Sequence, residues 1–199
     1  MLVRDRMSRE VITIAAERPI SDAGRLLARH RIRQLPVMRK GQLVGIITHR
    51  DLRTARPPTR TVASVMTAKP FTITSDAAID EAARLMRTYK IGGLPVVERK
   101  QLIGIITVAD VLDAFVTLSG VSERTYRVAV MGGGDGTAGR RARRAVERAH
   151  GELKWLYRDA QPRRPQLHMR IKAKRVDDVV AALEADGFEV VRVVAPRAR

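Results

Sequence analysis

Residues 42–51 of the chain read Gln-Leu-Val-Gly-Ile-Ile-Thr-His-Arg-Asp, and residues 101–110 read Gln-Leu-Ile-Gly-Ile-Ile-Thr-Val-Ala-Asp. Both stretches belong to a longer internal repeat, in which residues 7–53 align without gaps with residues 66–112 and 18 of the 47 positions are identical. Such a repeat indicates one supersecondary unit that occurs twice. One unit is small for an independent core, so we expect the two copies to pack around a pseudo-twofold axis.

Each copy predicts the order β-α-β-β-α, and the fold class is therefore α/β (α+β). A short strand is expected first, at residues 11–14 and 71–73, and then a helix whose apolar residues keep i, i+3, i+4, i+7 spacing. Ser21 and Asp80 are candidate N-caps of these helices. Two short apolar strands follow, and a second helix begins after the threonine of each stretch quoted above.

The repeated elements resemble those of a known family. Leu-Pro-Val at residues 35–37 and 94–96, with the doubled Gly-Ile-Ile-Thr-x-x-Asp, is similar to a tandem CBS-domain pair, also called a Bateman module. The resemblance implies one CBS repeat at residues 1–57 and a second at 58–118. It also implies clefts between the repeats that bind adenosine-containing ligands of the AMP, ADP and ATP class, and self-association into a homodimer.

Thr48 and Asp51 stand three residues apart at a strand-to-helix turn, as do Thr107 and Asp110. One interpretation is a capping box, in which the threonine and the acid satisfy backbone amides at the start of a helix. In the other, the carboxylate accepts both hydroxyls of a ribose, and the threonine hydroxyl bonds a ribose or phosphate oxygen. The resemblance favours the ribose role, and one residue can serve both purposes.

The resemblance also implies which residues form two nucleotide sites. The first site combines groups from both repeats: Gln34, Thr48, Asp51, Met66 and Phe71. The second site is its counterpart: Gly93, Thr107, Asp110, Met7 and Ile12. Ordinary core packing is the alternative for Met7, Ile12 and Phe71.

The two sites are expected to differ in charge. His49-Arg50 separates the threonine from the aspartate in the first site, whereas Val108-Ala109 does so in the second. Phosphate groups are held by arginine or lysine donors. We therefore expect the first site, with Arg50, to take the charged nucleotide, AMP or ATP, for which Mg²⁺ is a possible companion. The alternative is that Arg50 belongs to a basic surface that faces solvent or a second subunit.

Residues 124–196 predict a second kind of domain, with the order β-α-β-β-α-β of a ferredoxin-like sandwich. This order is similar to an ACT domain, and CBS pairs with such a tail resemble acetoin-utilisation protein B-like proteins. The resemblance implies that the tail senses or transmits a second signal. Within it, Gly134-x-Gly136-x-x-Gly139 is interpreted as a turn, with anion or dinucleotide binding as alternatives.

The formal net charge of the 199-residue chain is +17, with +8 in residues 1–57, +1 in 58–119 and +8 in 120–199. Basic proteins attract nucleic acids, anionic lipid or phosphorylated small molecules, although arginines on ordinary solvated faces give the same count. The alternative function is therefore nucleic-acid binding by the basic C-terminal region. Trp155 and Tyr157 there either stack bases or face a helix or a neighbouring subunit.

Several functional classes are not expected. The chain has no cysteine, which excludes disulfides, thiolate metal sites and cysteine nucleophiles. Its four histidines are scattered without ligand spacing, and no nucleophile or acid–base set is present, so we expect no catalytic residues, no metal site and no enzyme. No apolar run is long enough to span a membrane, and the N-terminus lacks the apolar region of a secretory signal, so a cytoplasmic protein is expected.

Overall fold

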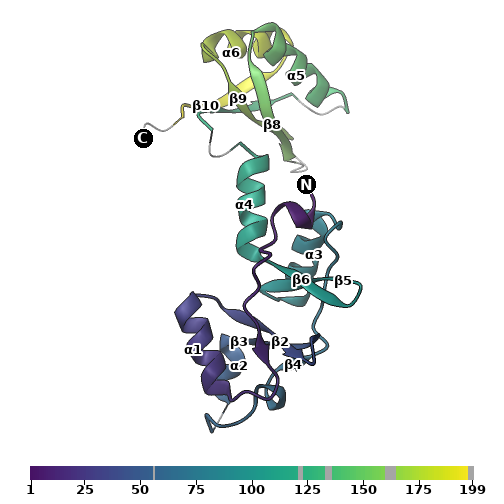
Figure 1. Ribbon diagram of the computed structural model, residues 1–199. Helices are drawn as coiled ribbons and strands as arrows, with labels where there is room; N and C mark the ends of the chain where they lie inside the picture. The colour runs from purple at the N-terminus through teal and green to yellow at the C-terminus, as the bar shows by residue number, and fades with distance from the viewer. Residues whose placement is uncertain (56, 121–122, 133–135, 160–164, 197–199) are drawn as a thin grey trace. The chain divides into compact units, whose positions relative to one another are not determined.

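The computed structural model describes residues 1–55, 57–120, 123–132, 136–159 and 165–196. The chain divides into two units, Met1–Ala114 and Phe115–Arg199, and the boundary falls within one helix (Figure 1).

The N-terminal unit contains both repeats, and each has the predicted order of helix, hairpin and helix. The elements of the first repeat are β1 (Ile14–Ala15), α1 (Ile20–His30), β2 (Gln34–Arg39), β3 (Gln42–Thr48) and α2 (His49–Thr54). Those of the second are α3 (Ile79–Tyr89), β5 (Gly93–Glu98), β6 (Gln101–Thr107) and α4 (Val108–Leu118). Both hairpins are antiparallel in the same register, which pairs Leu35 with Ile47 and Leu94 with Ile106.

The segment that precedes each repeat packs on the other repeat. The N-terminal segment, with the 3-10 turn Val3–Asp5, donates from the Val3 amide to the Ala77 carbonyl at 2.9 Å and buries Val3 in the second core. The segment between the repeats, with the 3-10 turn Val62–Ser64 and β4 (Thr67–Ala68), buries Val62 in the first core. There β4 pairs with β3, giving the sheet order β1-β2-β3-β4. Each core is therefore completed by a distant segment.

The first strands predicted at residues 11–14 and 71–73 were confirmed only at their C-terminal ends, and their bounds were wrong. The ladder in the first repeat is limited to Ile14 and Ala15 beside β2, and in the second only Ile73 bridges to Val96. Ile12 and Ile14 pack on the first core. The apolar spacing thus reflects core packing, which a strand-like pattern does not distinguish from a ladder.

The predicted N-caps, Ser21 and Asp80, were wrong. The caps are Pro19 and Ala78, and neither makes a side-chain cap. Instead, the first amide of α1 donates to the Arg60 carbonyl at 2.8 Å, and the first amide of α3 donates to the Met1 carbonyl at 3.2 Å. The packed segments thus satisfy helix amides that otherwise need a side-chain cap.

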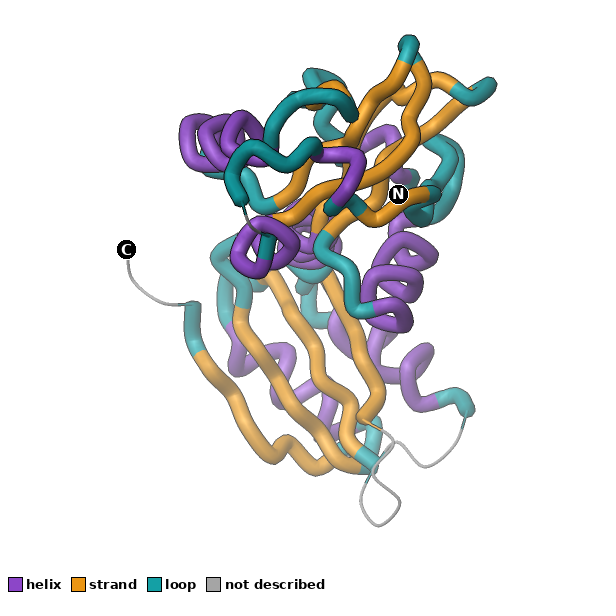
Figure 2. The backbone as a smooth tube through the Cα atoms, turned by 90° about the horizontal axis from the view of Figure 1, so that it is seen from below, coloured by secondary structure: helices purple, strands orange, loops and turns teal. Residues whose placement is uncertain are grey.

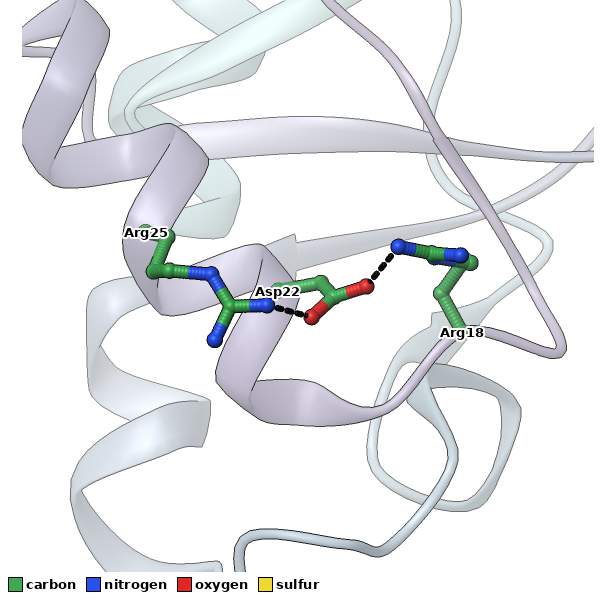
Figure 3. A network of polar contacts seen from close by, with 3 residues as sticks. All are labelled: Arg18, Asp22 and Arg25. Carbon is green, nitrogen blue, oxygen red and sulfur yellow. Dashed lines mark hydrogen bonds and ion pairs between the residues drawn. The ribbon is translucent and has the colours of Figure 1, made fainter.

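An ion-pair network lies at the start of α1 (Figure 3). The guanidinium groups of Arg18 and Arg25 both contact the Asp22 carboxylate, whose side chain is only 10% exposed. Asp22 occupies the first helical turn, where a negative charge is favourable against the helix dipole. The network therefore fixes α1 at the point where the segment between the repeats crosses it.

We expect Asp22→Asn to lower the free energy of unfolding by about 1 kcal/mol, because a neutral amide loses both ion pairs and the dipole interaction. Urea denaturation followed by circular dichroism measures the change. Glu81→Gln is the matched control, since Glu81 occupies the corresponding position of α3 and is exposed. Equal stability of the two variants would contradict a stabilising role for Asp22.

The C-terminal unit confirms the predicted β-α-β-β-α-β order. Its elements are β7 (Tyr126–Met131), α5 (Ala138–Arg148), β8 (Glu152–Asp159), β9 (Gln166–Lys172), α6 (Val176–Ala185) and β10 (Glu189–Val194). The four strands lie in the order β10-β7-β9-β8, all antiparallel, as in a ferredoxin-like sandwich (Figure 2). Apolar residues of β7 and β9 pack against α5 and α6. Gly134 of the glycine motif lies outside the described residues.

Candidate functional site

The Thr48–Asp51 turn joins β3 to α2, and its hydrogen bonds form the predicted capping box. The Thr48 amide and hydroxyl both donate to Oδ2 of Asp51 at 2.8 Å, and the Asp51 amide donates back to the Thr48 hydroxyl at 3.4 Å. Both residues are half-buried. The cap therefore holds the carboxylate in one orientation at the end of the hairpin.

The Thr107–Asp110 turn repeats this geometry between β6 and α4. The Thr107 amide and hydroxyl donate to Oδ2 of Asp110 at 2.7 Å, and the Asp110 amide is 3.5 Å from the Thr107 hydroxyl. In both turns the protein uses Oδ2 alone: no donor among the described residues bonds Oδ1 of Asp51 or Asp110. A fixed carboxylate with one oxygen available can accept hydroxyl donors from a ligand without losing its cap.

Gln34 connects the ends of the two hairpins. It pairs with Thr48 across the first hairpin, and Gly93 pairs with Thr107 across the second. A Cβ on Gly93 would lie 2.0 Å from Nε2 of Gln34 and 2.9 Å from the Ile106 carbonyl oxygen. The Gln34 side chain thus lies directly against the Gly93 backbone, and any side chain on residue 93 would displace it.

Nε2 of Gln34 is buried and has no hydrogen-bond partner among the described residues. An amide N–H donor without an acceptor costs roughly 1–3 kcal/mol. Buried unsatisfied side-chain atoms of this kind are uncommon in native proteins, and a polar atom of this kind is suited to bind an acceptor on a ligand. The donor therefore marks a place between the repeats where a ligand acceptor would be stabilised.

The two methionines lie on the strands that end in the threonines. A Cβ on Gly45 of β3 would be 2.3 Å from Sδ of Met66, and one on Gly104 of β6 would be 2.7 Å from Sδ of Met7. Met7 also packs in the second core, with 8% of its surface exposed. The structure thus brings each methionine to the hairpin expected from the sequence, while its contact with a ligand stays a prediction.

Phe71 lies at the surface, whereas Ile12 packs against the first core. The Phe71 ring stacks on Tyr89 at the end of α3, with 4.0 Å between centroids, and both rings are 48% exposed. Ile12 packs against the first core, in line with the core-packing alternative. Neither the Phe71–Tyr89 stack nor the core packing of Ile12 involves a Thr–Asp turn, so their ligand roles stay predictions.

The charge difference between the two turns is also visible. Arg50 is exposed at the start of α2 and forms no ion pair within the described part of the chain. The corresponding residue of α4 is Ala109. The first turn therefore carries a cation next to Asp51, and the second turn carries none next to Asp110. An anionic ligand would bind more favourably at the first turn, because arginine pairs with phosphate.

Sequence reasoning missed the contact between Gln34 and Gly93, although a signal was present. The two residues occupy the same position of the aligned repeats, so a pseudo-twofold axis brings them face to face. A long amide in one copy and a glycine in the other are complementary in size.

Within the described ranges, no cluster of three or more histidine, aspartate or glutamate side chains is arranged to hold a metal ion. Of the helices that the structure describes, none combines the length and apolar character needed to cross a membrane.

Comparison with known proteins finds similar sequences and similar solved structures for part of this chain. The inosine-5'-monophosphate dehydrogenase of Korarchaeum cryptofilum is 41% identical over 104 residues, which are 52% of this chain and only 22% of the dehydrogenase. A candidate acetoin utilization protein (AcuB) from Vibrio cholerae is 30% identical with a TM-score of 0.57, covering 62% of this chain and 96% of that one.

Two further solved structures contain adenosine compounds. The CBS domain pair of protein MJ0100, in complex with 5'-methylthioadenosine and S-adenosyl-L-methionine, is 35% identical with a TM-score of 0.54, covering 58% of this chain and 99% of that one. CBSX2 from Arabidopsis thaliana, in complex with AMP, is 27% identical with a TM-score of 0.54, covering 58% and 96%. The CBS domain family model itself matches residues 3–57 and 62–117. The chain therefore belongs to the CBS domain family and carries a tandem CBS pair.

Proposed function

We propose that the protein is a regulatory, non-catalytic sensor whose CBS pair binds an adenosine-containing nucleotide between the repeats. The observation that carries this proposal is the pair of capped aspartates, in which the cap uses Oδ2 and no described residue donates to Oδ1. Nε2 of Gln34, which is buried and has no hydrogen-bond partner among the described residues, supports it. So do the adenosine compounds in the MJ0100 and CBSX2 structures.

Each residue has a distinct role in this proposal. Asp51 and Asp110 accept hydrogen bonds from ribose hydroxyls, and Thr48 and Thr107 hold those carboxylates in place. Gln34 donates to an acceptor on the adenine or ribose. Arg50 pairs with phosphate, so the first site takes the charged nucleotide in preference to the second.

Regulation requires the ligand to prefer one arrangement of the protein over another, since a ligand with equal affinity for two states shifts neither. We propose that the C-terminal unit is an ACT-like module that senses or transmits a second signal. Its support is the β-α-β-β-α-β order and the β10-β7-β9-β8 sheet.

The test is thermal unfolding of the full chain with AMP, ADP, ATP, 5'-methylthioadenosine or S-adenosylmethionine, and with GMP as the matched control. A ligand that binds only the folded state stabilises it by about 2.7 kcal/mol at one hundred times its Kd. We expect an adenosine compound to raise the midpoint with concentration and GMP to leave it unchanged. If no adenosine compound raises the midpoint, the Thr–Asp pairs serve only as helix caps and the proposal is wrong.

A homodimer is part of the proposal, and α4 offers a surface for it. Four large apolar residues on one side of this helix are each more than half exposed: Val108, Leu112, Phe115 and Leu118. Water contact with such a stripe is unfavourable, and a second copy of the chain would remove it.

We therefore expect Leu112→Glu to convert the dimer into a monomer, because the dimer would bury the added charge without a partner. Size-exclusion chromatography with light scattering measures the mass. Ala109→Glu, on the same helix but outside the stripe, should leave the dimer intact. A wild-type chain that is already monomeric, or a Leu112→Glu variant that stays dimeric, would contradict this assignment of α4.

A further inference from the structure

The two described helices of the C-terminal unit that pack on its sheet, α5 and α6, cover the same face and leave the other face without a helix of this unit. Val128, Val130, Leu167 and Met169 point toward α5 and α6 and are buried there. Because side chains alternate along a strand, the residues between them point to the opposite face. That open face is hollowed into a cavity of about 590 Å³ lined by residues from all four strands.

The chemistry of this open face is aromatic and cationic. We call it the aromatic–arginine face and define it by the polar and ring side chains that line its hollow: Arg127, Trp155, Tyr157, His168, Arg170 and Arg192. No acidic residue is among the described lining residues, although the unit as a whole contains acids on its strands. The described lining of the hollow is therefore cationic, while the carboxylates of this face, Glu152, Asp159 and Glu189, lie at the ends of the strands.

The strand register arranges these side chains in two rows across the sheet. In the first row, Arg170 stands opposite Trp155 on one side and Arg127 on the other. In the second row, His168 stands opposite Tyr157 and Ala129, and Ala129 stands opposite Arg192. The first row thus runs from the Trp155 ring on β8 to Arg127 on β7, and the second runs from the Tyr157 ring on β8 to Arg192 on β10.

The rings form a continuous stacked surface. The Trp155 and Tyr157 centroids are 5.8 Å apart with planes inclined by 14°, and the Tyr157 and His168 centroids are 6.3 Å apart. Tyr157 is 49% exposed. The alternative that these rings face a helix is wrong: a register shift between Leu153 and Trp155 turns Leu153 and Leu156 to the core and leaves both rings on the open face.

Within the described ranges, the arginines of this face form no ion pair. Arg127 and Arg170 are directly opposite each other, and neither they nor Arg192 contact a carboxylate of a described residue. Burial, and then the charge of Arg127, lower the pKa of Arg170. Like charges opposite each other on adjacent strands are destabilising, so an anion placed over them would stabilise the folded unit.

Charge and shape together select the occupant. A second copy stacked face to face would bring two sets of three arginines together, which electrostatic repulsion opposes. A duplex keeps its bases stacked inside and offers no free base plane to Trp155 and Tyr157. Unpaired bases stack on aromatic side chains while cations track the phosphates, and this combination matches the rows described above.

We propose that the aromatic–arginine face binds single-stranded nucleic acid, RNA or DNA. Bases stack on Trp155 and Tyr157, and phosphates lie over Arg127, Arg170 and Arg192. This site is separate from the nucleotide clefts of the CBS pair, and the proposal stands whether or not those clefts bind adenosine compounds.

The test uses the full chain and twelve-nucleotide oligo(U) and oligo(dT) strands, with a duplex of the same length for comparison. Trp155 is the single tryptophan of the chain, so stacking should quench its fluorescence directly. Tyr157→Ala should weaken binding by about fivefold or more, as measured by fluorescence anisotropy. Arg127→Gln with Arg170→Gln should also reduce the slope of log K against log salt by about 1.4, because two phosphate contacts are lost.

The matched control is Arg143→Gln with Arg144→Gln, which removes the same charge from exposed positions of α5, on the opposite side of the sheet. This control and Asp51→Asn should both bind like the wild type. Circular dichroism establishes that every variant is folded. Absence of tryptophan quenching, equal loss in the α5 control, equal affinity for the duplex, or binding only to phosphatidylserine vesicles would each overturn the proposal.

Discussion

Asp51→Asn is expected to weaken binding of the adenosine compound by about a hundredfold. Hydrogen bonds to a charged group each contribute roughly 1.5–3 kcal/mol, and the proposed ribose contact places at least one of them on Oδ1. The amide oxygen of asparagine still accepts from the Thr48 amide, so the helix cap is largely retained. Isothermal titration calorimetry on the folded variant measures the loss.

Two matched variants make this result specific. Asp5→Asn removes another carboxylate at the N3 position of a helical turn, one that accepts a hydrogen bond from the Leu2 amide at 2.8 Å. Asp5 belongs to neither Thr–Asp turn, so this variant should bind the adenosine compound like the wild type. Asp110→Asn should cause a smaller loss than Asp51→Asn, because the second turn lacks the counterpart of Arg50. Equal losses of affinity in Asp51→Asn and Asp110→Asn would contradict the proposal that the first site takes the charged nucleotide in preference to the second.

Val3→Asp is expected to destabilise the N-terminal unit by about 4 kcal/mol or more. Val3 is fully buried in the core of the second repeat, and an unpaired charge there has neither water nor a counter-ion. An N-terminal residue is ordinarily tolerant of substitution, so the size of the effect reports the packing of this segment on the second repeat.

Chemical denaturation followed by circular dichroism measures the Val3→Asp effect. Arg9→Asp introduces the same side chain at an exposed position of the same segment and should change stability by less than about 0.5 kcal/mol. A Val3→Asp protein as stable as Arg9→Asp would mean that the N-terminal segment does not complete the second core.

Local patterns in the sequence predicted the hairpins and the turns. The Leu-Pro-Val and Gly-Ile-Ile-Thr elements correctly placed β2, β3, β5 and β6, because short apolar runs bounded by turn residues specify buried strands. The three-residue spacing of Thr48 and Asp51 correctly predicted a capping box, since that motif depends only on neighbours in the chain.

The packing of the N-terminal segment on the second repeat, and of the segment between the repeats on the first, was not predictable from local patterns. Nothing near Val3 or Val62 indicates that each completes the core of the other repeat, since the contact partner lies far along the chain. The wrong caps follow from this: the amides at the start of α1 and α3 are satisfied by Arg60 and Met1 carbonyls. Likewise, the sequence left open whether Trp155 and Tyr157 stack bases or face a helix, because the register shift between Leu153 and Trp155 decides which face of the sheet they occupy.

The most direct test of the nucleotide proposal compares the adenosine compound that stabilises the chain most with its 2'-deoxy counterpart, by isothermal titration calorimetry on the full chain. If Asp51 accepts the ribose hydroxyls, removing one hydroxyl should weaken binding at least about tenfold, and Asp51→Asn should abolish the difference between the two compounds. Equal affinity of the wild-type chain for both compounds would contradict the assignment of the capped aspartates to the ribose.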